Sequence, residues 1–120
     1  MRVRALRGAV TAEGNTKEAI IESTTELLEE MLDRNDIATD DLITIIITAT
    51  ADITAEFPAA AARKIGLSHI PLLSARELSV ESALPLTIRA LMLINTEKAR
   101  EQLRHVYLRE ARQLRMDLPE

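Results

Sequence analysis

Apolar and polar residues alternate along the beginning of the chain, from residue 2 to residue 11. A period of two is typical of a β-strand, so the pattern predicts a strand here, with Arg2 and Arg4 on one face and Arg7 on the other. Three later apolar runs predict further strands, and they lie at residues 70–75, 85–94 and 105–108.

A fifth strand is predicted over residues 42–49, LITIIITA. Every residue from Ile43 to Thr48 is β-branched. Such a run disfavours a helix and favours a strand that is buried on both of its faces.

Two segments carry helical signals. Asn15 or Thr16 is expected to cap the first helix, because Asn15 and Glu18 have the spacing of a capping box. This helix should end near Asn35 and bury one stripe, made of Ile20, Thr24, Leu27, Leu28 and Met31. A short second helix is predicted to begin at Pro58, continue through an alanine run and stop at Gly66.

Strands and helices alternate, so the expected fold class is α+β with an α/β-like order of elements. We expect a single domain over residues 1–120, in which helices cover one mixed β-sheet, with residues 112–120 as a polar C-terminal tail. A chain of this length can bury about two thirds of its unfolded surface, which is enough for one core.

Composition removes several classes of site. The chain has no cysteine, and its two histidines, His69 and His105, are far apart, so we expect neither a metal site nor a disulfide. The three glycines never share a loop, which excludes a glycine-rich phosphate site. The net charge of −4 makes nucleic acid and anionic membranes poor partners, and without a signal-like segment at the start a cytoplasmic location is expected.

Arg89 lies in the middle of the uncharged run PLTIRALMLI. A guanidinium stays protonated, so a strand that buries it must also provide an anion. That anion is either an internal carboxylate such as Glu77 on the adjacent strand, which would make Arg89 structural, or a bound anionic ligand. The residue pattern leaves both alternatives open.

Other cationic or hydrogen-bonding side chains also lie on apolar segments, near the ends of the predicted strands. They are Arg7, Arg63, Ser74, Glu77, Tyr107 and Arg115. Each has an ordinary structural explanation when taken singly. As a set, several guanidiniums and a phenol would bind a small dianion, and Glu77 could accept a hydrogen bond from a substrate hydroxyl. No nucleophile is paired with a base, so such a site would bind and orient its ligand.

Longer strings resemble a known family. RALRGAVT, TADITAEFPAAAARKIG, PLLSARE, PLTIRALMLINT, RHVYLREA and LRMDL follow in order and spacing the pattern of the trimeric monofunctional chorismate mutases, over about residues 2–118. The resemblance implies a homotrimeric pseudo-α/β barrel with active sites between subunits. It also implies an isomerase of aromatic amino acid biosynthesis, which converts chorismate to prephenate without a cofactor or metal.

The resemblance also implies a role for each candidate. Arg89 would lie against the ether oxygen and a carboxylate, Arg7 and Tyr107 against the side-chain carboxylate, and Glu77 against the ring hydroxyl. Phe57 would pack on the ring from the neighbouring subunit, beside Arg63. Arg63 and Arg115 would attract the other carboxylate near the mouth of the site. The remaining residues that would line the substrate site are Ala59, Leu73 and Ser74. The chain departs from the family pattern at Ser74, Ala60 and Met116, where some members carry Cys, Lys and Pro.

Two other functions remain as alternatives. One is a trimeric imine deaminase of similar fold, which also uses an arginine to bind a carboxylate but whose motifs do not match RHVYL. The other is a trimer that binds an aromatic-pathway metabolite without turnover.

Overall fold

The structure is a computed structural model that describes residues 1–115. It contains five strands and two α-helices, and these confirm the elements predicted from the sequence. In chain order they are β1 (Arg2–Thr11), α1 (Lys17–Arg34), β2 (Leu42–Ala49), α2 (Ala59–Lys64), β3 (Leu72–Arg76), β4 (Thr87–Thr96) and β5 (Val106–Leu108). Three short 3-10 helices complete the fold, and they are η1 (Thr39–Asp41), η2 (Arg100–Gln102) and η3 (Arg109–Leu114).

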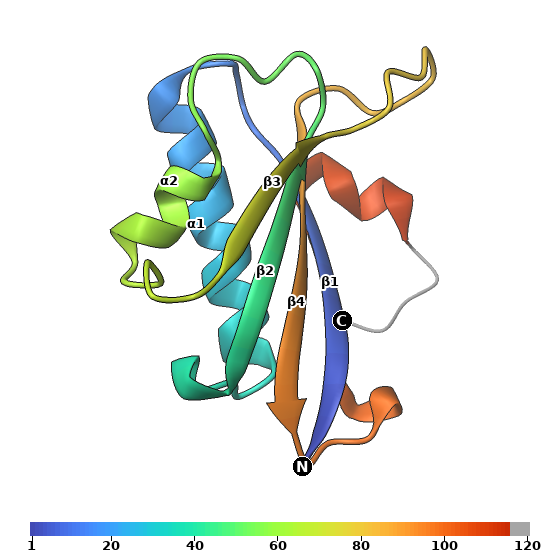
Figure 1. Cartoon of the computed structure of the whole chain (residues 1–120). Coiled ribbons are helices and arrows are strands. Elements are labelled where there is room, and N and C mark those ends of the chain that lie inside the picture. Colours follow the sequence, from blue (N-terminus) through green and yellow to red (C-terminus); the bar gives the residue numbers. More distant parts are fainter. Residues whose placement is uncertain (116–120) are drawn as a thin grey trace.

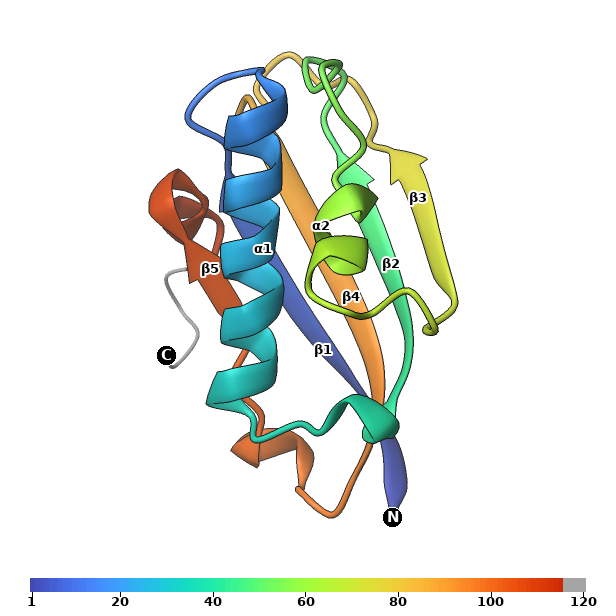
Figure 2. The ribbon, with the colours of Figure 1, turned by 90° about the vertical axis from the view of Figure 1, so that its left-hand side faces the viewer.

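The strands form one mixed sheet in the order β3-β2-β4-β1-β5. The central pairs β2/β4 and β1/β4 are antiparallel, and the outer pairs β2/β3 and β1/β5 are parallel. Helices α1 and α2 lie on one face of this sheet, while η3 lies toward the other side (Figures 1 and 2). The fold is therefore the single α+β domain that the sequence predicts, with one sheet face left open in the isolated chain.

The core fills the space between the sheet and α1. Leu27, Leu28 and Met31 of α1 are fully buried, as the helical stripe predicts. Gly8 of β1 lies directly under this helix, and a Cβ atom there would be only 2.6 Å from Met31 Sδ. Glycine at position 8 thus lets α1 approach the sheet closely.

Both ends of α1 are closed by polar side chains. Thr16 is the N-cap and accepts a hydrogen bond from the Ala19 N–H at 3.1 Å. The expected alternative cap, Asn15, instead accepts from the N–H groups of Thr54 and Ala55, so it holds the loop before α2. At the other end, the side chain of buried Asn35 donates to the carbonyl of Met31 and joins the helix to the segment before β5.

Strand β2 corrects one expectation. Its residues Ile45 and Ile47 are buried beneath the helices, but Thr44, Ile46 and Thr48 on the alternate face are only half-buried. The β-branched run therefore predicted the strand correctly, while burial on both faces is not reached within one chain. An uncovered apolar sheet face is a typical site of contact with another subunit.

The C-terminal segment is tied to the rest of the domain. Residues 109–114, which overlap the expected polar tail, form η3, and Ala111 within it is fully buried. The Arg109 guanidinium lies 3.1 Å from Glu13, 3.5 Å from Glu22 and 3.4 Å from Glu26. The rest of the expected tail, including Met116, is outside the described residues. Within the described part, no helix combines the length and apolar character needed to cross a membrane.

Candidate active site

Strand pairing brings several candidate residues into one row across the sheet. Thr48 of β2 lies opposite Arg89 of β4, Arg89 lies opposite Ala9 of β1, and Ala9 pairs with Tyr107 of β5. Residues paired in this way point to the same face of a sheet. Because the neighbouring Gly8 points toward α1, this row points away from the helices. Arg89 and Tyr107 therefore project from the open face.

Arg89 has a carboxylate partner. Its Nε atom lies 3.2 Å from both carboxylate oxygens of Glu77, and Glu77 also accepts a hydrogen bond of 2.6 Å from the Thr48 hydroxyl. Glu77 follows β3, so it is two strands away from β4, and the expectation that it lies on the adjacent strand is wrong. Thr48 on the strand between them holds the carboxylate in place.

The pairing leaves Arg89 accessible. Its side chain is 44% exposed, whereas that of Glu77 is 17% exposed, so the expectation of a buried guanidinium is also wrong. Arg89 donates to Glu77 through Nε, and the described residues provide no hydrogen-bond acceptor for its two terminal nitrogens. The internal carboxylate thus orients Arg89 without occupying its whole guanidinium.

Arg7 lies in the next row of the open face. It is opposite Leu91 of β4, and Leu91 pairs with Ile46, which pairs with Leu73 of β3. Arg7 is exposed, and within residues 1–115 no carboxylate lies at ion-pair distance from it. The open face therefore holds a second cation, two residues along β1 from the row of Arg89.

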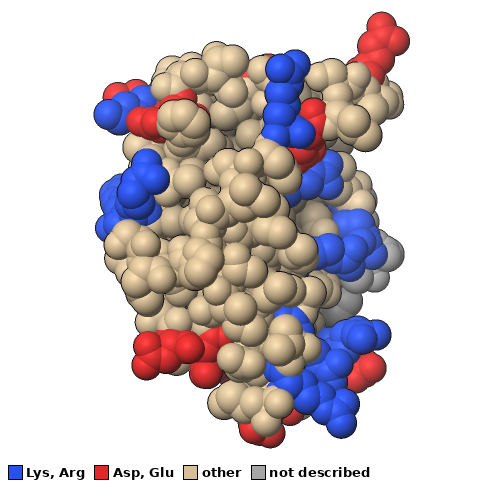
Figure 3. All heavy atoms as spheres, in the orientation of Figure 1, with Lys and Arg blue, Asp and Glu red and all other residues tan. Residues whose placement is uncertain are grey.

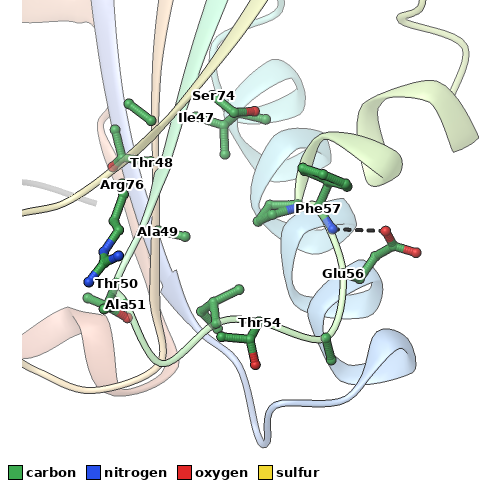
Figure 4. Close-up of a pocket in the computed structure, with 14 residues that line it drawn as sticks. Ile47, Thr48, Ala49, Thr50, Ala51, Thr54, Glu56, Phe57, Ser74 and Arg76 are labelled. Atoms are coloured by element: carbon green, nitrogen blue, oxygen red, sulfur yellow. Dashed lines mark hydrogen bonds between the residues drawn. The ribbon is translucent and has the colours of Figure 1, made fainter.

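A second group of candidates lies around α2. Phe57, Ala59, Arg63 and Ser74 line one cavity of about 470 Å³ between this helix and β3. Phe57 and Ser74 also border a neighbouring cavity of about 470 Å³, where the side chain of Ser74 points toward Phe57 (Figure 4). Ser74 pairs with the buried Ile47, so it lies on the helix-covered side of the sheet.

The candidates therefore form two groups in one chain. Arg7, Glu77, Arg89 and Tyr107 share the open face, and Phe57, Ala59, Arg63 and Ser74 gather beside α2. Among residues 1–115, no side-chain hydrogen bond or ion pair joins the two groups. Leu73 lies at the edge between them and is 62% exposed, and Phe57 is 69% exposed.

The expectation that candidates lie at strand ends holds only in part. Glu77 directly follows β3 and Arg89 is near the start of β4, but Arg7 and Ser74 lie well inside their strands. The first group lies on the open face of the sheet, so the face rather than one end of the strands brings these candidate residues together.

Arg115 directly follows η3 and is half-buried. Burial lowers the pKa of the His105 imidazole most, and the positive charges of Arg7 and Arg115 lower it further. The C-terminal segment thus brings a further cation toward the Arg7 side of the open face. Lys and Arg side chains gather along this side of the molecule, to the right of the sheet in the view of Figure 1, although the net charge is negative (Figure 3).

Two residues of this region were not among the sequence candidates. Thr48 fixes Glu77, and His105 accepts a hydrogen bond from the backbone of Arg7 at 3.0 Å. Their signal in the sequence is weak: Thr48 is a polar position in a β-branched run, and His105 stands two residues before Tyr107. Only the strand register shows which side chains they meet.

Comparison with known proteins gives a consistent result. The sequence model of the family "Chorismate mutase type I" matches residues 3–118. The chain is 52% identical to the chorismate mutase AroH of Thermus thermophilus over 117 residues, covering 97% of this chain and 96% of that protein. It is 37% identical to the chorismate mutase AroH of Bacillus subtilis strain 168 over 119 residues, covering 98% and 94%.

A solved structure agrees with the sequence matches. The fold superimposes on a chorismate mutase from Clostridium thermocellum with a TM-score of 0.90 and 41% sequence identity, covering 92% of this chain and 98% of that one. Fold, sequence and the cationic open face lead to one assignment: the chain belongs to the type I chorismate mutase family.

Proposed function

We propose that this chorismate mutase rearranges chorismate to prephenate on the open face of the sheet, with Arg89 as the catalytic cation. The single observation that carries the proposal is the contact of Arg89 with Glu77, which is made through Nε and leaves the side chain 44% exposed. A guanidinium held in this way is already oriented before the substrate arrives, which lowers the cost of reorganisation during the reaction.

The reaction explains why such a site needs cations and no nucleophile. In the Claisen rearrangement one C–O bond breaks while one C–C bond forms within the same molecule, and negative charge develops on the ether oxygen. The enzyme must select the reactive conformer of a dianion and stabilise that charge. A well-placed charge at the oxygen contributes roughly 3–6 kcal/mol, extrapolating upward from the loss of a neutral oxyanion donor.

The other open-face residues would orient the substrate. In this proposal Arg7 and Tyr107 bind the side-chain carboxylate, since a cation and a phenol hydroxyl both donate hydrogen bonds to carboxylate oxygens. Glu77 accepts a hydrogen bond from the ring hydroxyl while it holds Arg89 in place. Arg115 attracts the other carboxylate near the mouth of the site, together with Arg63.

The second group of candidates would come from a neighbouring copy. We propose that the active form is a homotrimer in which Phe57, Ala59 and Arg63 of one subunit cover the open face of the next. Three features support this arrangement: no side-chain hydrogen bond or ion pair joins the two groups within residues 1–115, Phe57 is 69% exposed, and Leu73 on the edge strand β3 is 62% exposed. Apolar side chains at such an exposure are typical of subunit contacts.

A complementation experiment tests the shared site. Arg89→Gln removes the cation from one half, and the double variant Phe57→Ala, Arg63→Ala removes the other half. The two inactive proteins are unfolded, mixed in equal amounts and refolded, with each protein refolded alone as its control. If the halves come from different copies, random assembly restores both intact halves in about one quarter of the sites.

Restored activity near one quarter of the refolded parent is the expected result. No activity above that of the single variants would show that both halves belong to one chain. The molar mass of the parent, measured by light scattering, gives the number of copies independently of turnover.

Neither alternative function gains support, because the family model and both curated relatives are chorismate mutases rather than imine deaminases or non-catalytic binding proteins. The cytoplasmic location expected from the sequence stays part of the proposal, and the biosynthetic role of the family is consistent with it.

A further inference from the structure

We propose that His105 is a positioning residue for substrate binding, which acts by holding the backbone of Arg7 and the start of β5 together. This inference rests on the proposed role of Arg7 and Tyr107 at the substrate carboxylate. The contact that carries it is the hydrogen bond from the Arg7 N–H to Nδ1 of His105, at 3.0 Å.

This hydrogen bond extends the pairing of β1 with β5 by one residue. Strand β5 is three residues long, and its parallel pairing with β1 begins at Gly8 and Val106. One residue earlier, the imidazole of His105 provides the acceptor that the backbone would provide in a longer strand. A strand this short makes few main-chain hydrogen bonds, so one additional hydrogen bond at its start is a large share of those that hold it against β1.

Through this link His105 connects two substrate-binding residues. It accepts a hydrogen bond from the backbone N–H of Arg7, and it lies one residue before β5, two residues before Tyr107. Tyr107 pairs with Ala9, two residues along β1 from Arg7, so the Arg7 and Tyr107 side chains lie on the same face of the sheet. Loss of the bond frees the Arg7 N–H and loosens the start of β5. The distance between the Arg7 guanidinium and the Tyr107 hydroxyl is then less well defined.

The hydrogen bond also requires one protonation state. Nδ1 can accept only while it carries no proton, so the neutral ring must have its proton on Nε2. Burial, Arg7 of β1 and Arg115 after η3 all lower the pKa of His105, in this order of size. Its chain neighbour Arg104 directs its guanidinium to the carbonyls of Glu101 and Leu103. The imidazole therefore stays neutral at neutral pH, and its protonation would break the bond and add a cation beside Arg7.

The test compares two substitutions at this position. In His105→Asn the amide oxygen lies close to where Nδ1 was and still accepts a hydrogen bond, but it does not titrate. In His105→Leu the acceptor is lost. We expect the Leu variant to raise the KM for chorismate about five- to tenfold, the size of one lost hydrogen bond, with a smaller change in kcat, and the Asn variant to stay within about threefold of the parent. His69→Asn, in the exposed loop before β3, is the matched control.

The pH profile provides a readout that a purely structural role would not change. The parent should lose kcat/KM on the acid side as His105 is protonated, whereas the Asn variant should lack this limb. Equal losses in the Asn and Leu variants, or an unchanged KM in the Leu variant, would overturn the inference. A parent that does not convert chorismate at all would refute the proposed function instead.

If the Leu variant does not assemble, nitrogen NMR of the parent imidazole decides the question. A neutral ring with an unprotonated Nδ1 at pH 7 is the expected result. A ring protonated at Nδ1 under these conditions contradicts the inference, whatever the activity.

Discussion

Replacing Arg89 by glutamine separates catalysis from folding. The substitution removes the charge but keeps a polar side chain on the third residue of β4. A cation at the ether oxygen is worth roughly 3–6 kcal/mol in the transition state, extrapolating as above. At 1.36 kcal/mol for each tenfold change in rate, turnover should fall by about 10²- to 10⁴-fold.

The same substitution should hardly affect stability. The ion pair between Arg89 and Glu77 is partly exposed, and such pairs contribute about 0–1 kcal/mol. Glu77 also keeps its hydrogen bond from Thr48 when the arginine is gone. The free energy of unfolding in urea should therefore change by about 1 kcal/mol or less.

The assay follows the ultraviolet absorbance of chorismate at saturating substrate. Arg100→Gln is the matched control, because Arg100 is an exposed arginine in η2, beyond the opposite end of β4. The reasoning is refuted if Arg89→Gln retains turnover within tenfold of the parent, or if its loss of activity is matched by a comparable loss of folded protein.

Three further substitutions test other parts of the account. Glu77→Gln should lower kcat/KM about 10- to 100-fold, since a charged acceptor for both Arg89 and the ring hydroxyl is lost, and an unchanged kcat/KM would contradict this. Arg115→Ala should raise the KM about tenfold with little change in kcat, and the rise in KM should be larger at low salt. A fall in kcat with an unchanged KM would contradict a role of Arg115 in substrate capture. Asp52→Ala should destabilise the fold by about 1 kcal/mol, because the Asp52 carboxylate accepts from the Thr50 hydroxyl and the Leu86 N–H. Burial alone would raise the pKa of Asp52, but these two bonds, with one from its own backbone, outweigh burial and lower it. The stabilisation should therefore be present above the unfolded pKa of about 3.9 and disappear as the pH falls below it. The free energies of unfolding in urea of parent and variant should become equal at that low pH. A difference that stays constant with pH would contradict the role given to the Asp52 carboxylate.

The elements could be read from the sequence because their signals are local. The alternation in β1, the β-branched run of β2 and the stripe on α1 each depend on neighbouring residues, and the structure confirms all three. The burial of Arg89 was predicted wrongly for the same reason. An uncharged run predicts a strand, but it does not show that one face of the sheet has no helix over it.

The candidate site could be predicted as a set of residues but not as a geometry. Shared chemistry and family motifs indicate Arg7, Arg89 and Tyr107, and the pairing of β4, β1 and β5 places them on one face. The roles of Thr48 and His105 depend on contacts between strands far apart in the chain, at sequence separations of 29 and 98 residues. No local pattern contains that information.

The conversion of chorismate by the purified protein tests the central claim most directly. The account predicts that chorismate absorbance falls far faster than in buffer, that prephenate appears in equal amount, and that neither a chelator nor the absence of added cofactor slows the reaction. A rate no greater than the uncatalysed background, from protein that is folded, would contradict it.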